Sequence, residues 1–153
     1  MSINVKKNIL YSDSWFSKDL IDIGLKLKFP KLTEVSLEKI RQSYLTLQDI
    51  IKQDKWIYGV SSGFGPLSKE DASQNKKIQE RLIYHLASGI GPYLQPEIIR
   101  MIFALRLKEL AQGYSGINPK TFQKLKKAFD IDFLPKVPAL GSVYTSTERL
   151  GTM

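Results

Sequence analysis

The sequence contains no cysteine and only one histidine among its 153 residues. The absence of cysteine excludes disulfide bonds and thiolate metal sites, and it fits a reducing compartment. A single histidine excludes a metal cluster built from several histidines. No apolar run reaches the roughly 20 residues of a membrane-spanning helix, and the N-terminal residues lack an apolar run of signal-peptide length. We therefore expect a cytoplasmic protein with no membrane partner and no metal.

The composition is typical of one globular domain. Apolar residues make up 42% and charged residues 25% of the chain, close to globular averages. The net charge of +8 invites comparison with nucleic-acid-binding proteins, but the excess is mostly lysine in short, scattered clusters, and no RNA- or DNA-binding motif accompanies them. We expect solvated helix faces rather than a nucleic-acid surface; affinity that falls steeply with salt would indicate the second interpretation.

The stretch YGVSSGFG, residues 58–65, contains three glycines. Glycine costs about 1 kcal/mol relative to alanine inside a helix and is common where the backbone needs a positive φ or a close approach. The spacing is not the nucleotide-binding GxGxxG pattern, and the lysine of a phosphate loop is missing. We predict a loop in which Tyr58 is either a functional side chain or an anchor packed into the core.

Apolar periodicity predicts a mainly α fold. A short helix is expected to begin near Trp15 and to end near Pro30. Ser36 is predicted to be the N-cap of the next helix, with Val35 and Ile40 forming a hydrophobic staple across its first turn.

Further helices are predicted in the second half of the chain. One should pass through His85 and stop at Gly89. The next, over residues 97–112 with Pro96 in its first turn, is apolar nearly all round and should be buried or sandwiched between other elements. Arg106 would then need a partner or a path to water.

The last predicted helix follows a turn that begins at Gly113. Asn118 and Pro119 have the sequence of an N-cap and first helical position. Residues 134–138 should be extended, because prolines and their predecessors avoid the α conformation. The side chains expected to face inward are Phe122, Leu125 and Phe129, and those expected to face outward are Lys120, Lys124 and Lys127.

Four segments together resemble the aromatic amino acid ammonia-lyases, the family of histidine, phenylalanine and tyrosine ammonia-lyases. They are YGVSSGFG, YHLASGIGPYL, RLKELAQGYSGI and LPKVPALGSV, in the family's order and at its approximate spacing from Tyr58 to Val143. The resemblance implies that residues 1–143 are the N-terminal domain of the family's helical fold and that residues 144–153 are a divergent tail. It also implies elimination of ammonia from an aromatic amino acid, giving an α,β-unsaturated acid, in a homotetramer.

The resemblance assigns roles to individual residues. Tyr58 matches the base or acid that works at the substrate β-carbon, which requires its pKa to be depressed from about 10. Gly65, His85 and Leu86 match substrate-binding positions. His85-Leu86 is similar to the pair of tyrosine ammonia-lyases, whereas phenylalanine-specific members have Phe-Leu and histidine-specific members Ser-His. An imidazole can exchange a hydrogen bond with a phenolic hydroxyl, which favours tyrosine over phenylalanine and leaves histidine open. A purely structural His85 is the alternative.

The resemblance breaks where family members form their electrophile, a methylidene-imidazolone made from Ala-Ser-Gly. Aligned without gaps, this chain has Thr145, Ser146 and Thr147 at those positions. Cyclisation needs the third residue's amide to approach the first residue's carbonyl, which glycine permits and a β-branched threonine hinders. We keep Ser146 as a remnant of the electrophile loop and expect no cofactor to form.

The family's central helical bundle has no counterpart after residue 143. We therefore expect an N-terminal fragment of an ammonia-lyase, truncated before that bundle and inactive as an isolated chain. The alternative is a non-enzymatic helical module, or pseudoenzyme, that binds a full-length paralogue. Co-purification with a longer lyase chain would support this alternative.

Overall fold

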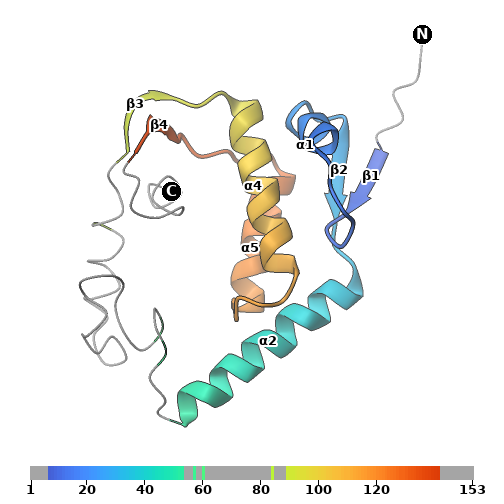
Figure 1. The fold of residues 1–153 in the computed structure, drawn as a ribbon, viewed down its shortest axis with the longest axis vertical. Coiled ribbons are helices and arrows are strands. Elements are labelled where there is room, and N and C mark those ends of the chain that lie inside the picture. The colour runs from blue at the N-terminus through green and yellow to red at the C-terminus, as the bar shows by residue number, and fades with distance from the viewer. Residues whose placement is uncertain (1–6, 54–56, 58–59, 61–83, 85–88, 142–153) are drawn as a thin grey trace. The chain divides into compact units, whose positions relative to one another are not determined.

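The computed structural model describes residues 7–53, 57, 60, 84 and 89–141 and is mainly helical in that range (Figure 1). This confirms the predicted fold class. The chain divides into two compact units, Met1–Leu47 with Gln95–Pro135, and Gln48–Leu94 with Lys136–Met153. The described elements are β1 (Lys7–Leu10), α1 (Ser17–Gly24), β2 (Lys28–Lys31), α2 (Glu34–Lys52), β3 (Ile90–Tyr93), α4 (Pro96–Ala111), α5 (Pro119–Asp130) and β4 (Pro138–Leu140).

The first unit begins with a parallel pair of short strands joined by α1. In this pair Ile9 lies opposite Pro30 in β2, so the predicted helix from Trp15 to the neighbourhood of Pro30 is wrong at its C-terminal end. The helix stops at Gly24, and Lys26 adopts a left-handed conformation with φ of 60°, which turns the chain back into β2. A proline fits there because a two-stranded sheet consists of edge strands, in which an N–H can be missing.

The N-terminus of α2 lies earlier than predicted. The helix begins at Glu34, and Thr33 Oγ1 accepts a hydrogen bond from the Ser36 amide at 3.1 Å. Ser36 is therefore inside the first turn rather than its cap. The cap is therefore Thr33 and not Ser36. With this earlier start, Val35 points to solvent with 66% of its surface exposed, so the predicted staple with Ile40 is wrong.

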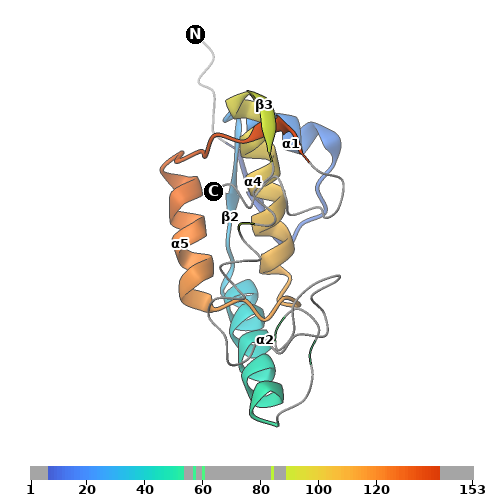
Figure 2. The same ribbon diagram turned by 90° about the vertical axis from the view of Figure 1, so that its left-hand side faces the viewer.

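The caps of α4 and α5 are as predicted. Pro96 is in the first turn of α4, and the Asn118 side chain accepts a hydrogen bond from the Lys120 amide at 2.9 Å. Arg106 Nη1 reaches Glu109 Oε2 at 2.6 Å, so the expected partner is present. The prediction that α4 is buried or sandwiched holds in its second form, because α4 packs against both α1 and α5 (Figure 2). The helix is not buried all round, since Ile98 and Leu105 are exposed.

The core of the first unit lies among α1, α4 and α5. The predicted inward side chains of α5 are confirmed, since Phe122 and Phe129 are buried and Leu125 packs against the core. Phe129 meets Phe103 of α4 edge to face, with ring centroids 5.5 Å apart, an arrangement that aromatic rings favour. This packing fixes α5 against α4 and holds the residues after α5 near the N-terminal half of α4.

Candidate functional site

The residues assigned to the site by the sequence lie outside the described part of the chain. These are Tyr58, Gly65, His85, Leu86, Thr145, Ser146 and Thr147. Their predicted roles stay predictions. The structure does describe residues beside these segments: Ile57 and Val60, residues 89–94, and residues 134–141.

The glycine-containing stretch begins at a turn. The Val60 amide donates to the Ile57 carbonyl at 3.1 Å, which is the bond of a four-residue turn between these two positions. Both residues are half-buried. Positions 58 and 59 themselves lie outside the described residues, so the loop that holds Tyr58 stays a prediction.

The second unit contains a strand pair that the sequence did not predict. β3 and β4 pair antiparallel, with Ile90 opposite Leu140 and Tyr93 opposite Pro138. β3 follows the His85-containing segment, and β4 precedes Ser146. The pairing therefore brings together residues 90–93, which follow the predicted substrate-binding pair in the sequence, and residues 138–140, which precede the predicted electrophile position. This juxtaposition is the feature of the described residues that bears most directly on the site.

Two glycines of the SGIG motif make the close approach of β3 and β4 possible. A β-carbon on Gly89 would lie 2.8 Å from Pro138 Cγ, and Gly91 has a φ of +87° with Leu140 at 3.2 Å from such an atom. Side chains are strained at that φ and crowded at that distance. The glycines of this motif thus have a structural reason within the strand pair.

A charged cluster in the first unit was missed by the sequence analysis, which singled out Arg106 instead. Arg100 is 8% exposed, and its guanidinium donates to Asp132 Oδ1 at 2.9 Å and to the Gly24 carbonyl. Lys26 donates to the same carboxylate. Arg100 and Lys26 lower the pKa of Asp132 through these hydrogen bonds, and the cluster ties α1, α4 and the end of α5 together.

The described residues do not offer a metal site. Within the ranges given above, no group of three or more histidine, cysteine, aspartate or glutamate side chains could hold an ion. Nor is any described helix long and apolar enough to cross a membrane.

The chain belongs to the aromatic amino acid lyase family. The family model, described as "Aromatic amino acid lyase", matches residues 18–148, which include all four motifs quoted above. The family resemblance inferred from these motifs is therefore confirmed.

Curated relatives are histidine ammonia-lyases. The chain is 37% identical over 139 residues to that of Mus musculus and 34% identical to that of Homo sapiens, covering 90% of this chain and 21% of each relative. The chain thus spans about a fifth of the length of these relatives. These matches do not confirm the predicted similarity of the His85-Leu86 pair to tyrosine ammonia-lyases.

Solved structures of the family share the fold. Histidine ammonia-lyase from Trypanosoma cruzi superimposes with a TM-score of 0.77 at 27% identity, over 95% of this chain and 29% of that one. A phenylalanine aminomutase from Pantoea agglomerans superimposes with a TM-score of 0.86 at 20% identity, over 95% and 29%. The second likeness concerns the fold alone.

Proposed function

We propose that the chain is the N-terminal part of an aromatic amino acid ammonia-lyase, with residues 1–143 as its domain and residues 144–153 as a divergent tail. The observation that supports this most is the match of the family model over residues 18–148. In the intact enzyme, Tyr58 serves at the substrate β-carbon, and Gly65, His85 and Leu86 bind the substrate. The assembly is a homotetramer in the cytoplasm.

The proposed substrate is tyrosine, with histidine as the competing substrate. His85 supports tyrosine because an imidazole can hydrogen-bond to a phenolic hydroxyl, while the named curated relatives support histidine. A chimera tests the choice: residues 78–93 of this chain replace the corresponding segment of an active family enzyme. The ratios of kcat/KM for tyrosine to those for histidine and for phenylalanine should rise, and the ratio to phenylalanine should fall back with His85→Phe. An unchanged ratio in both chimeras would count against His85 as a ring contact.

The residues at the electrophile position do not fit the family's cofactor. The methylidene-imidazolone requires Ala-Ser-Gly, and Thr145 and Thr147 replace the two residues that must approach each other. A β-branched Thr147 crowds the attacking amide. We therefore propose that no electrophile forms on this chain and that it does not catalyse the elimination.

Intact-mass spectrometry of the purified chain tests this proposal directly. The expected mass is that of the unmodified polypeptide. Formation of the electrophile would remove one water on cyclisation of the backbone and a further water on dehydration of Ser146. Ammonia release from tyrosine, histidine and phenylalanine should not exceed that of buffer. A lower mass that reverts in Ser146→Ala would show that the electrophile forms despite Thr147.

The second candidate function is that of a pseudoenzyme that binds a full-length paralogue. It is favoured by apolar side chains on and beside α1 that project into solvent: Phe16, Ile21 and Leu25 have 74%, 53% and 55% of their surface exposed. Tagged chain should then retain a longer lyase chain from cells that make both. A lone monomer in the presence of the longer chain would argue against this role.

A further inference from the structure

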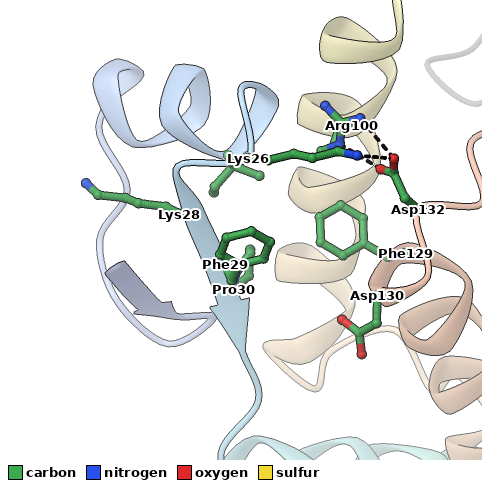
Figure 3. A pocket seen from close by; sticks show the side chains of 9 residues that line it. Lys26, Lys28, Phe29, Pro30, Arg100, Phe129, Asp130 and Asp132 are labelled. Atoms are coloured by element: carbon green, nitrogen blue, oxygen red, sulfur yellow. Dashed lines mark hydrogen bonds and ion pairs between the residues drawn. The ribbon is translucent and has the colours of Figure 1, made fainter. Parts of the chain in front are cut away.

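A pocket of about 320 Å³ lies in the first unit, between the α1–β2 turn, α4 and the end of α5 (Figure 3). Its volume is at the lower end of the roughly 300–1,000 Å³ of small-molecule sites. One part of its lining is charged and the other is apolar. Its described lining residues come from α1, β2, α4, α5 and the segments that follow α1 and α5.

The charged part contains more cation than anion. Asp132 accepts from both Arg100 and Lys26, so two cations share one carboxylate. Lysine has three N–H donors and arginine five. Among the described residues, Lys26 Nζ uses one donor on Asp132, and half of its side chain is exposed. Donors therefore remain at this edge of the pocket.

The other two ionised side chains of the lining are occupied elsewhere. Figure 3 shows the Lys28 ammonium group directed away from Asp132; it bonds to Asp19 and lies 3.3 Å from Asp22. Both carboxylate oxygens of Asp130 accept from Lys126 at 2.6 Å. The local excess of one positive charge thus lies at the edge formed by Lys26 and Arg100.

The apolar part consists of the side chains next to this edge. Ile23 is fully buried, Pro30 is buried, and Phe129 is 8% exposed; Phe29 completes this wall. In Figure 3 the rings of Phe29 and Phe129 lie below Lys26 and Asp132. A flat apolar body lying against these rings would remove their remaining exposed surface, chiefly that of the half-buried Phe29, from water, which is favourable in proportion to the area.

We propose that this pocket binds a small monocarboxylate with an aromatic body. The ligand's carboxylate lies at the exposed ammonium group of Lys26, beside the buried Arg100, where it neutralises the excess positive charge. Its ring lies against Phe29 and Phe129. The proposal rests on the described residues of this pocket and does not depend on the substrate position assigned to the intact lyase.

Isothermal titration calorimetry of the full chain with 3-phenylpropanoate at pH 7 tests the proposal. Lys26→Met keeps the aliphatic stem and removes the charge, and it should weaken binding about tenfold. The matched control is Lys124→Met, on the exposed face of α5, which should bind like the unchanged chain. Circular dichroism of both variants establishes that each is folded.

Each other result decides against the proposal. Equal affinities of the Lys26→Met and unchanged chains would remove the carboxylate contact. Tighter binding of 2-phenylethylammonium would show that the pocket prefers a cation. Displacement of 3-phenylpropanoate by inorganic phosphate at equal concentration would show that the apolar wall contributes nothing. Neither heat nor a rise in the melting temperature at millimolar ligand would show that no such site exists.

Discussion

Arg100 of α4 and Asp132, two residues beyond α5, form an ion pair with Arg100 Nε 2.9 Å from Asp132 Oδ1. The same guanidinium also donates to the carbonyl of Gly24, the last residue of α1. One side chain thus satisfies groups on two other elements. A buried charge held in this way is costly to leave without its partner.

Arg100→Met should lower the free energy of unfolding by about 2–3 kcal/mol, because the substitution leaves a carbonyl and part of a carboxylate without donors. Urea unfolding of the full chain measures this loss. The matched control is Arg106→Met on the same helix, whose ion pair with Glu109 is exposed and should contribute less than about 1 kcal/mol. Similar losses in the two variants would show that the contacts of Arg100 are not special.

The same pair predicts a dependence of stability on pH. The pKa of Asp132 is lowered, chiefly by its hydrogen bond from Arg100, while in the unfolded chain it should be about 3.9. The pKa of Asp132 is thus lower in the folded chain than in the unfolded chain. The ion pair therefore stabilises the protein fully at pH values above the unfolded pKa, and this contribution is lost as the pH falls through the folded pKa.

Unfolding free energies between pH 7 and pH 3 measure this effect. Asp132→Asn should be less stable at pH 7, and the difference from the unchanged chain should narrow toward pH 3. Asp19 and Glu38 also have lowered pKa values. The unchanged chain and Asp132→Asn both retain these two residues, so the comparison isolates Asp132. A constant difference across the range would contradict the assignment.

The N-cap of α5 offers a test of a feature that the sequence predicted. Asn118→Ala removes the acceptor of the Lys120 amide and should cost about 1 kcal/mol of stability. Asn118→Asp is the control, since it keeps an acceptor and adds a negative charge at the helix N-terminus, where such a charge is favourable. Chemical denaturation compares the two; a loss in Asn118→Asp as large as in Asn118→Ala would rule out the cap as the cause.

Sequence patterns were sufficient where structure is decided locally. Asn118-Pro119 and Pro96 mark helix starts through the geometry of single residues, and the spacing of Phe122 and Phe129 determines which face of α5 is buried. The predicted start of α2 was wrong because Thr33 and Ser36 are both good N-cap residues, and the sequence does not show which one is used. The choice of cap decides whether Val35 faces the core or the solvent.

Sequence patterns failed where contacts between distant residues decide. The segment Ile90–Tyr93 contains glycine and proline, which are poor strand formers, and becomes β3 only through its pairing with Pro138–Leu140. Arg100 and Arg106 look alike in the sequence, and only the position of Asp132 distinguishes the buried one. For the lyase site, motif order predicted the family, while the roles of Tyr58 and His85 stay predictions.

Glycines at two turn positions should differ in their tolerance of a side chain. Gly113 and Gly116 both have positive φ, but a β-carbon at 113 would lie 2.8 Å from the backbone of Lys39, whereas one at 116 would meet the side chain of Leu47. A side chain can move more cheaply than a backbone. Gly113→Ala should therefore cost more stability than Gly116→Ala, which should lose about 1 kcal/mol or more from the conformation alone. The order of the two melting temperatures checks this; the reverse order would contradict it.

The hydroxyl of Tyr11 leads to the last prediction. Tyr11 is fully buried, and its hydroxyl has no hydrogen-bond partner among the described residues; burial raises its pKa above the ordinary value. An unpartnered buried hydroxyl destabilises the folded state, because it has lost its hydrogen bonds to water.

Tyr11→Phe should therefore leave the free energy of unfolding unchanged or raise it by up to about 1 kcal/mol, since the ring and its packing are kept. Tyr44→Phe is the matched control, because the Tyr44 hydroxyl accepts a long hydrogen bond of 3.5 Å from Asn118 and its removal should cost a few tenths of a kcal/mol at most. Urea unfolding of both variants measures the two changes. A loss of about 1 kcal/mol or more in Tyr11→Phe alone would mean that the hydroxyl is bonded in solution, and this buried group would then stabilise the core.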